Sequence, residues 1–223
     1  NDAGGSLCEL EEPSVIDLLV NNAGGTPPTP VLQLTDEAFE AAFHFNVTSA
    51  LHLSRQVIPY MLKRKDGAIL NISSALSYMV ESGFTAYGTS KAALSHMTRM
   101  MACEFAPHVR VNALAVGATL TDALSPFVAS GDLKEQMEAL TPMGRLGTTE
   151  DIAHAALYLS SPAASWVTGK ILEVDRKVNP KTAGTDVAAK LEQFGVAYEA
   201  GDGIGFEKNF TTLEAMLPLD GTP

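Results

Sequence analysis

The sequence predicts an α/β fold in which a parallel β-sheet is covered by helices on both faces. Four short segments rich in Val, Ile and Leu are apolar at consecutive positions, which is typical of strands buried on both sides. The predicted strands are residues 15–20, 68–72, 109–116 and 171–174. Because longer segments with helical spacing of apolar residues separate them, we expect right-handed crossovers between parallel strands.

Capping residues place the ends of the intervening helices. Thr35, followed by two acidic residues, is a predicted N-cap, and the helix that it starts is expected to continue to Arg64. A second helix is expected at residues 84–106, ending before a proline. Thr148 and Asp151 have the spacing of a capping box, which predicts the start of a third helix.

The chain is long enough for one domain with a sizeable core. We expect this domain at residues 15–177, preceded by a disordered leader at residues 1–14. Residues 178–223 form a polar, Gly-rich tail for which the sequence predicts no role.

Charge and composition exclude several classes of function. The net charge is −11, whereas binding to nucleic acid or to an anionic membrane needs clustered Lys and Arg. No apolar segment approaches the ~20 residues of a membrane-spanning helix. The two Cys and five His lack metal-ligand spacing, so no metal site is expected. These properties favour a soluble, cytoplasmic protein.

The predicted helix at residues 84–106 carries a reactive pair. Tyr87 and Lys91 are four residues apart and therefore lie on one face, which continues as an apolar stripe through Leu94 and Met101. A Lys on a buried face is costly unless it has a partner or a task. For such a pair alone, the alternative is that Lys91 extends into solvent.

Two further polar residues occur where apolar ones are expected. Ser74 follows the predicted strand at residues 68–72, and functional groups in open α/β sheets gather at the carboxyl ends of strands. Asn46 lies within the apolar stripe of the first helix, and a buried Asn needs hydrogen-bond partners. Each residue alone fits a cap or a satisfied core group; together with Tyr87 and Lys91 they favour a functional site.

The order and spacing of these residues, together with Asn21-Asn22-Ala23-Gly24, resemble the short-chain dehydrogenase/reductase family. The resemblance extends over about residues 16–175 and implies a Rossmann-like, doubly wound parallel sheet. Within the family, residues 109–175 look most like the bacterial 7α-hydroxysteroid dehydrogenases. Sugar dehydrogenases and ketoacyl-carrier-protein reductases share much of this pattern.

The resemblance implies a catalytic set of four residues. Tyr87 would be the general acid/base, and Lys91 would bind the nicotinamide ribose and help to lower the Tyr87 pKa, which must fall by about 3 units for work near neutral pH. Ser74 would hold the substrate oxygen, and Asn46 would anchor a water that relays protons. NAD or NADP would supply the hydride chemistry.

The resemblance also implies a cofactor-binding set. One group follows the first predicted strand and a second follows the third, where Val116-Gly117 replaces the family's usual Pro-Gly. With the catalytic pair included, the expected cofactor-binding residues are Asn21, Ala23, Gly24, Tyr87, Lys91, Gly117, Thr119 and Thr121. Residues 122–140 match the family's helical lid over the substrate.

One family feature has no counterpart in the sequence. The Gly-rich turn TGxxxGxG, whose amides hold the pyrophosphate, does not precede Asn21. We therefore expect an N-terminally truncated sheet that lacks its first strands, with residues 15–20 as an unpaired edge. Arg176-Lys177 stands where the family usually has Gly-Gly.

The expected function is that of an NAD(P)-dependent oxidoreductase interconverting a secondary alcohol and a ketone, with a substrate of the hydroxysteroid type. A homo-oligomer, dimer or tetramer, would assemble through the two long helices. One alternative is an inactive truncated remnant that acts only as a binding or assembly partner. Another is a sugar or 3-oxoacyl reductase of the same family.

Overall fold

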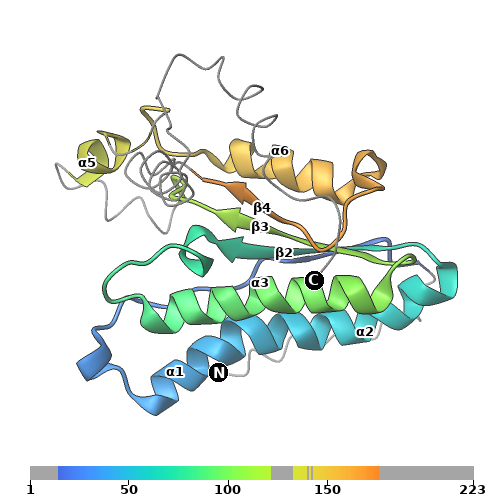
Figure 1. Cartoon of the computed structure of the whole chain (residues 1–223), viewed down its shortest axis with the longest axis horizontal. Coiled ribbons are helices and arrows are strands. Elements are labelled where there is room, and N and C mark those ends of the chain that lie inside the picture. Colours follow the sequence, from blue (N-terminus) through green and yellow to red (C-terminus); the bar gives the residue numbers. More distant parts are fainter. Residues whose placement is uncertain (1–14, 122–132, 140, 142, 176–223) are drawn as a thin grey trace, which may run out of the picture. The chain divides into compact units, whose positions relative to one another are not determined.

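The computed structural model describes residues 15–121, 133–139, 141 and 143–175, all within one compact unit (Figure 1). The predicted leader at residues 1–14 and the predicted tail at residues 178–223 lie outside the described residues. Most of the predicted lid also lies outside them.

A four-stranded parallel sheet forms the centre of this unit. The strands, in the spatial order β1-β2-β3-β4, are β1 (Leu18–Asn21), β2 (Ala68–Ser74), β3 (Arg110–Val116) and β4 (Ile171–Val174). The α/β class and the parallel sheet are therefore confirmed. The first strand starts three residues later than predicted, and β2 continues two residues further, which includes Ser74 within the strand.

Helices cover both faces of the sheet. Figure 1 shows α2 and α3 on one side of the strands and α6 on the other. The helical elements are η1 (Val31–Gln33), α1 (Asp36–Phe43), the π-helical turn η2 (His44–Thr48), α2 (Ser49–Arg64), η3 (Ala75–Ser77), α3 (Thr85–Phe105), α5 (Leu133–Ala139), α6 (Thr149–Ser160) and η4 (Pro162–Ala164). No helix among the described residues is long and apolar enough to cross a membrane.

The predicted caps are confirmed. The Thr35 hydroxyl accepts a hydrogen bond from the Ala38 amide at 3.2 Å, and α1 starts at the next residue. Thr148 and Asp151 form the reciprocal capping box at the start of α6. The predicted continuous helix from Thr35 to Arg64 is instead interrupted by η2.

Alternating side chains of the central strands divide the core into two clusters. Ile69 and Val111 pack with Met61 and Met101 on the side of α2 and α3. Leu70 and Leu114 pack with Leu159 of α6 on the other side. Because β4 continues the strand order while α6 covers the opposite face, the third crossover has the opposite hand to the first two. The expectation of right-handed crossovers throughout is therefore wrong for this connection.

The strand β1 is buried on one face alone. Leu19 packs against the cluster beneath α2 and α3, whereas Leu18 and Val20 are 43% and 44% exposed. Within residues 15–175, no described strand pairs with the outer edge of β1. The prediction that this strand is covered on both sides is wrong for the described part of the chain, because α6 contacts β2, β3 and β4.

Replacement of Arg110 should destabilise the fold. Its guanidinium donates hydrogen bonds to the carbonyls of Leu159, Ser161 and Val167 at 2.9, 3.3 and 3.5 Å, and so caps the end of α6. We expect Arg110→Met to lower the free energy of unfolding by about 2 kcal/mol, because charged donors are lost from partly buried carbonyls. Urea unfolding measures this change. Arg99→Met, at an exposed position on α3, is the control, and equal effects of the two substitutions would contradict the prediction.

Candidate active site

The candidate site lies where the carboxyl end of β2 meets the first turns of α3. Parallel pairing places Asn21 beside Asn71 and Ser74 beside Val116, so the strand ends share one edge of the sheet. Ser74 is the last residue of β2 and is buried. Tyr87 and Lys91 stand on successive turns of α3 above it, as their spacing predicts.

Lys91 is buried, with 3% of its surface exposed. Its ammonium donates a hydrogen bond to the Ile72 carbonyl at 2.8 Å and lies 5.7 Å from the centroid of the Tyr87 ring. The alternative that Lys91 extends into solvent is therefore wrong. Because burial disfavours the charged form, the pKa of Lys91 falls to about 8.

Burial and the neighbouring Ser74 hydroxyl both affect the pKa of the Tyr87 phenol. Burial raises the pKa of Tyr87, and the hydrogen bond with Ser74 lowers it by a smaller amount. The net direction is opposite to the expected fall of the Tyr87 pKa. The physical reason is that burial removes water from the phenol and so disfavours the phenolate. The Lys91 ammonium donates to the Ile72 carbonyl and lies over the phenol ring.

Asn46 is fully buried within the π-helical turn η2. Its side-chain Nδ2 donates to the Ala42 carbonyl at 2.8 Å and to the Gly25 carbonyl and Thr26 hydroxyl at 3.2 Å. Its Oδ1 accepts from the Gly25 amide at 2.9 Å. The wider π turn, a feature common at functional sites, thus ties α1 to the loop after β1. Because the protein supplies acceptors for both N–H groups of Nδ2, a relay water would have to bind to another atom of Asn46.

Gly24 lies between Asn46 and Lys91. A Cβ atom at this position would lie 2.7 Å from both Asn46 Oδ1 and Lys91 Nζ, closer than such atoms approach in proteins. The absence of a side chain therefore brings the loop after β1 into contact with the buried ammonium. The structure joins Gly24, Asn46, Ser74, Tyr87 and Lys91 in one site.

The Asn21 side chain makes its hydrogen bonds inside the protein. It is 5% exposed, and its Nδ2 donates to Asn71 Oδ1 at 2.8 Å and to the Ser54 hydroxyl at 3.3 Å. Its Oδ1 has no partner among the described residues. Asn71 in turn donates to the Thr98 hydroxyl at 2.9 Å. The Asn21 side chain therefore ties β1 to β2 and α2 inside the protein, while Ala23 is exposed.

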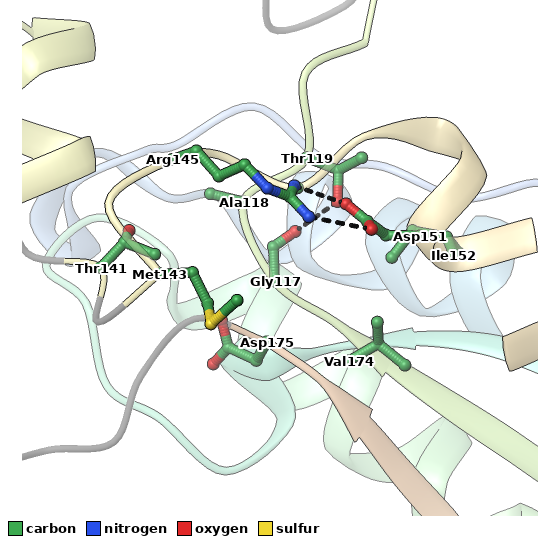
Figure 2. A pocket seen from close by; sticks show the side chains of 11 residues that line it. Gly117, Ala118, Thr119, Thr141, Met143, Arg145, Asp151, Ile152, Val174 and Asp175 are labelled. Carbon is green, nitrogen blue, oxygen red and sulfur yellow. Dashed lines mark hydrogen bonds and ion pairs between the residues drawn. The ribbon is translucent and has the colours of Figure 1, made fainter. Parts of the chain in front are cut away.

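A second region lies beyond the end of β3. Gly117 and Thr119 line a cavity of about 260 Å³, beside which Arg145 and Asp151 form a two-armed ion pair with N–O distances of 2.6 and 3.1 Å (Figure 2). The Thr119 hydroxyl donates to the Gly117 carbonyl at 3.2 Å. The lining residues of this cavity include neither Ser74 nor Tyr87 and Lys91 on α3, and Thr121 is exposed.

Most of the predicted site residues thus fall into two groups, one around Lys91 and one, Gly117 and Thr119, at the cavity beyond β3. Asn21, Ala23 and Thr121 belong to neither group. Arg145 and Asp151, which also line the cavity, were not predicted as site residues, although Asp151 was predicted as a cap. Among the described residues, no group of three or more His, Cys, Asp or Glu is placed to hold a metal ion.

The parallel sheet with helices on both faces places the described part of the chain in the Rossmann-like class of α/β proteins. The family model described as enoyl-(acyl carrier protein) reductase matches residues 10–177. The chain belongs to the short-chain dehydrogenase/reductase family.

Characterised relatives support this assignment. The chain is 47% identical over 161 residues to a 7α-hydroxysteroid dehydrogenase of Escherichia coli. The match covers 71% of this chain and 62% of the relative. It is 35% identical over 167 residues to a 3-oxoacyl-acyl-carrier-protein reductase of Chlamydia pneumoniae, covering 74% of this chain and 66% of the relative.

A solved structure agrees with both the fold and the family. It is that of a 7α-hydroxysteroid dehydrogenase complexed with NADH and 7-oxo glycochenodeoxycholic acid, with a TM-score of 0.68 and 44% identity. The match covers 74% of this chain and 66% of the solved one. The chain spans about three fifths of the length of the curated relatives that it matches with 47–48% identity.

Substitution of Gly24 should displace the Lys91 ammonium without unfolding the protein. We expect the added Cβ of Gly24→Ala to push Lys91 Nζ toward water, because the end of a Lys side chain moves more easily than the backbone. The Lys91 pKa should then rise from about 8 toward 10.5. The pH dependence of amine labelling at Lys91, read by peptide mass spectrometry, measures this shift. Ala23→Ser is the control, and an unchanged labelling curve would speak against the contact.

The stability of the fold should rise with pH through the titration of Lys91. Its pKa is about 8 in the folded protein and 10.5 as the reference value. Between these values the unfolded chain binds more protons, so stability increases as pH rises. Between pH 7 and pH 9.5, the free energy of unfolding of the wild type should increase by about 2 kcal/mol relative to that of Lys91→Met. Urea unfolding of both proteins tests this, and parallel stability curves would show that Lys91 titrates normally.

Proposed function

We propose that the protein is an NAD(P)-dependent oxidoreductase that interconverts a secondary alcohol and a ketone. The observation that carries this proposal is the buried Lys91 ammonium 5.7 Å from the centroid of the Tyr87 ring, next to the strand that ends at Ser74. A phenol and a hydroxyl placed in this way can both hydrogen-bond to one substrate oxygen. The phenol can also exchange a proton with that oxygen.

The residues of the site fit a nicotinamide dinucleotide. The Lys91 ammonium has three N–H donors, and one described acceptor, the Ile72 carbonyl, uses one of them. The remaining donors suit ribose hydroxyls, and Gly24 offers backbone without a side chain beside them. Lys91, Gly24 and the loop of Gly117 and Thr119 would hold the cofactor. When bound, the nicotinamide supplies the hydride donor or acceptor.

Each residue of the proposed site has a role that follows from its contacts. Ser74 orients the substrate oxygen, and Tyr87 moves a proton to or from it. Lys91 acts as a positive charge close to the phenol and as a donor toward the cofactor. Asn46 holds the Gly25 backbone and thereby the loop that contacts Lys91.

We propose a hydroxysteroid-type substrate. Support comes from the 47% identity to a 7α-hydroxysteroid dehydrogenase and from the structural match to such an enzyme with a 7-oxo bile acid. A 3-oxoacyl thioester is the second candidate, supported by the description of the matching family model and by the 35% identity to a 3-oxoacyl reductase. A panel of ketones that includes both classes separates the two.

A homo-oligomer assembled through α2 and α3 is part of this proposal. Apolar side chains on these helices are exposed, with Leu53 at 40%, Tyr60 at 36% and Met100 at 60%. Burial of such a patch against a second copy would remove apolar surface from water. Sedimentation of wild type and Met100→Lys compares the assembly, which should weaken when a charge enters the patch.

Replacement of the phenol hydroxyl should abolish turnover. We expect Tyr87→Phe to lower kcat by about 10²–10⁴-fold, because the proton donor to the substrate oxygen is lost while the ring is kept. Absorbance of the reduced nicotinamide, followed with 7-oxo bile acids and 3-oxoacyl thioesters, measures the rate. Tyr158→Phe, at an exposed position on α6, is the matched control.

The same assay distinguishes an active enzyme from an inactive protein that acts only as a binding or assembly partner. No turnover by the wild type with either cofactor, together with co-purification of a longer homologue, would support an assembly partner. Turnover that survives in Tyr87→Phe would show that the site is wrongly assigned.

A further inference from the structure

The turn that follows Ser74 is tied to the end of β4 by one side chain. Tyr78 comes directly after η3, and its hydroxyl donates to Asp175 Oδ2 at 3.1 Å. Asp175 follows the last residue of β4. The hydrogen bond therefore joins the segments that follow β2 and β4, through two residues that are 97 positions apart in the sequence.

The end of β3 makes room for this contact. A Cβ atom at Gly117 would overlap Asp175 Oδ1 and would lie 2.9 Å from the Asp175 Cα. The Gly117 amide also donates to the Val174 carbonyl at 2.9 Å. Asp175 is therefore packed against the backbone of the neighbouring strand end, which makes it a firm anchor for Tyr78.

The same turn determines how the Ser74 hydroxyl is placed. Ser74 Oγ accepts from the Leu76 amide at 3.2 Å, and the amides of Tyr78 and Met79 donate to the Ala75 carbonyl at 3.2 and 2.9 Å. A movement of the turn therefore changes the hydrogen bonding of Ser74. Since Ser74 contacts Tyr87, the effect reaches the phenol.

Tyr78 keeps its proton under ordinary conditions. Partial burial, followed by the charges of Asp175 and Glu173, raises the pKa of Tyr78 well above its usual value. Its hydroxyl is therefore a permanent donor. A neutral phenol that donates to a carboxylate makes a charge-assisted hydrogen bond, which is stronger than one between two neutral groups.

We propose that Tyr78 is a positioning residue, which ties the turn after Ser74 to Asp175 and so holds the Ser74 hydroxyl against Tyr87. This inference rests on the proposed function for its catalytic consequence. Its structural part, the tether, stands on the hydrogen bond and on the packing of Gly117.

Hydrogen exchange tests the tether without any need for turnover. Tyr78→Phe keeps the ring and removes the donor, so we expect about fivefold faster exchange of the amides of Leu76, Tyr78 and Met79. Asp175→Ala should have the same effect. Asp175→Asn keeps an acceptor oxygen and should restore slow exchange, while Tyr60→Phe is the matched control. Unchanged exchange in Tyr78→Phe would overturn the proposal.

The pH profile tests whether the tether positions the catalytic pair. Loss of the contact with Ser74 removes an interaction that lowers the Tyr87 pKa, so the limb of the rate profile that depends on Tyr87 should move to higher pH in Tyr78→Phe. A purely structural role would lower the rate without moving this limb, and that result would refute positioning. If the wild type shows no turnover, the proposed function fails and exchange alone decides the tether.

Discussion

Burying the Lys91 ammonium beside the end of β2 constrains every element around it. A charge removed from water is tolerated when it is hydrogen-bonded, and the Ile72 carbonyl meets this need. This hydrogen bond fixes the position of α3 along the direction of β2. Ser73 reinforces it, because its hydroxyl donates to the Lys91 carbonyl at 3.0 Å. Gly24 then becomes necessary, since the ammonium occupies the space of a side chain.

Polar contacts inside the sheet–helix interface give the fold a unique alignment. Asn21, Asn71 and Thr98 form a buried chain of hydrogen bonds from β1 through β2 to α3. A slip of one residue in β1 would turn Asn21 to the other face and break this chain. Asn46 fixes the loop after β1 in a similar way, through its hydrogen bonds to the backbone of Gly25. The site is therefore held by groups that also determine the register of the strands.

Local patterns were enough to predict the sheet, the caps and the pair on α3, because each depends on neighbours within a few residues. The contact of Tyr78 with Asp175 could not be predicted, since it joins segments that only the folded sheet brings together. The exposure of Leu18 and Val20 depends on which elements cover β1, which an apolar run does not reveal. The direction of the Tyr87 pKa shift depends on how deeply the folded protein buries the phenol, which the spacing of residues along the chain does not reveal.

The pKa shifts of Tyr87 and Lys91 bear on the direction of the proposed reaction. Burial raises the pKa of Tyr87 and lowers that of Lys91, so each shift favours a neutral side chain. The protein's own groups therefore do not form a phenolate–ammonium pair in advance. A protonated phenol next to Ser74 is the form that can donate a proton to the oxygen of a ketone as it becomes an alcohol. Oxidation instead needs the phenolate, which these residues disfavour. For the proposed function, these pKa shifts therefore favour reduction over oxidation.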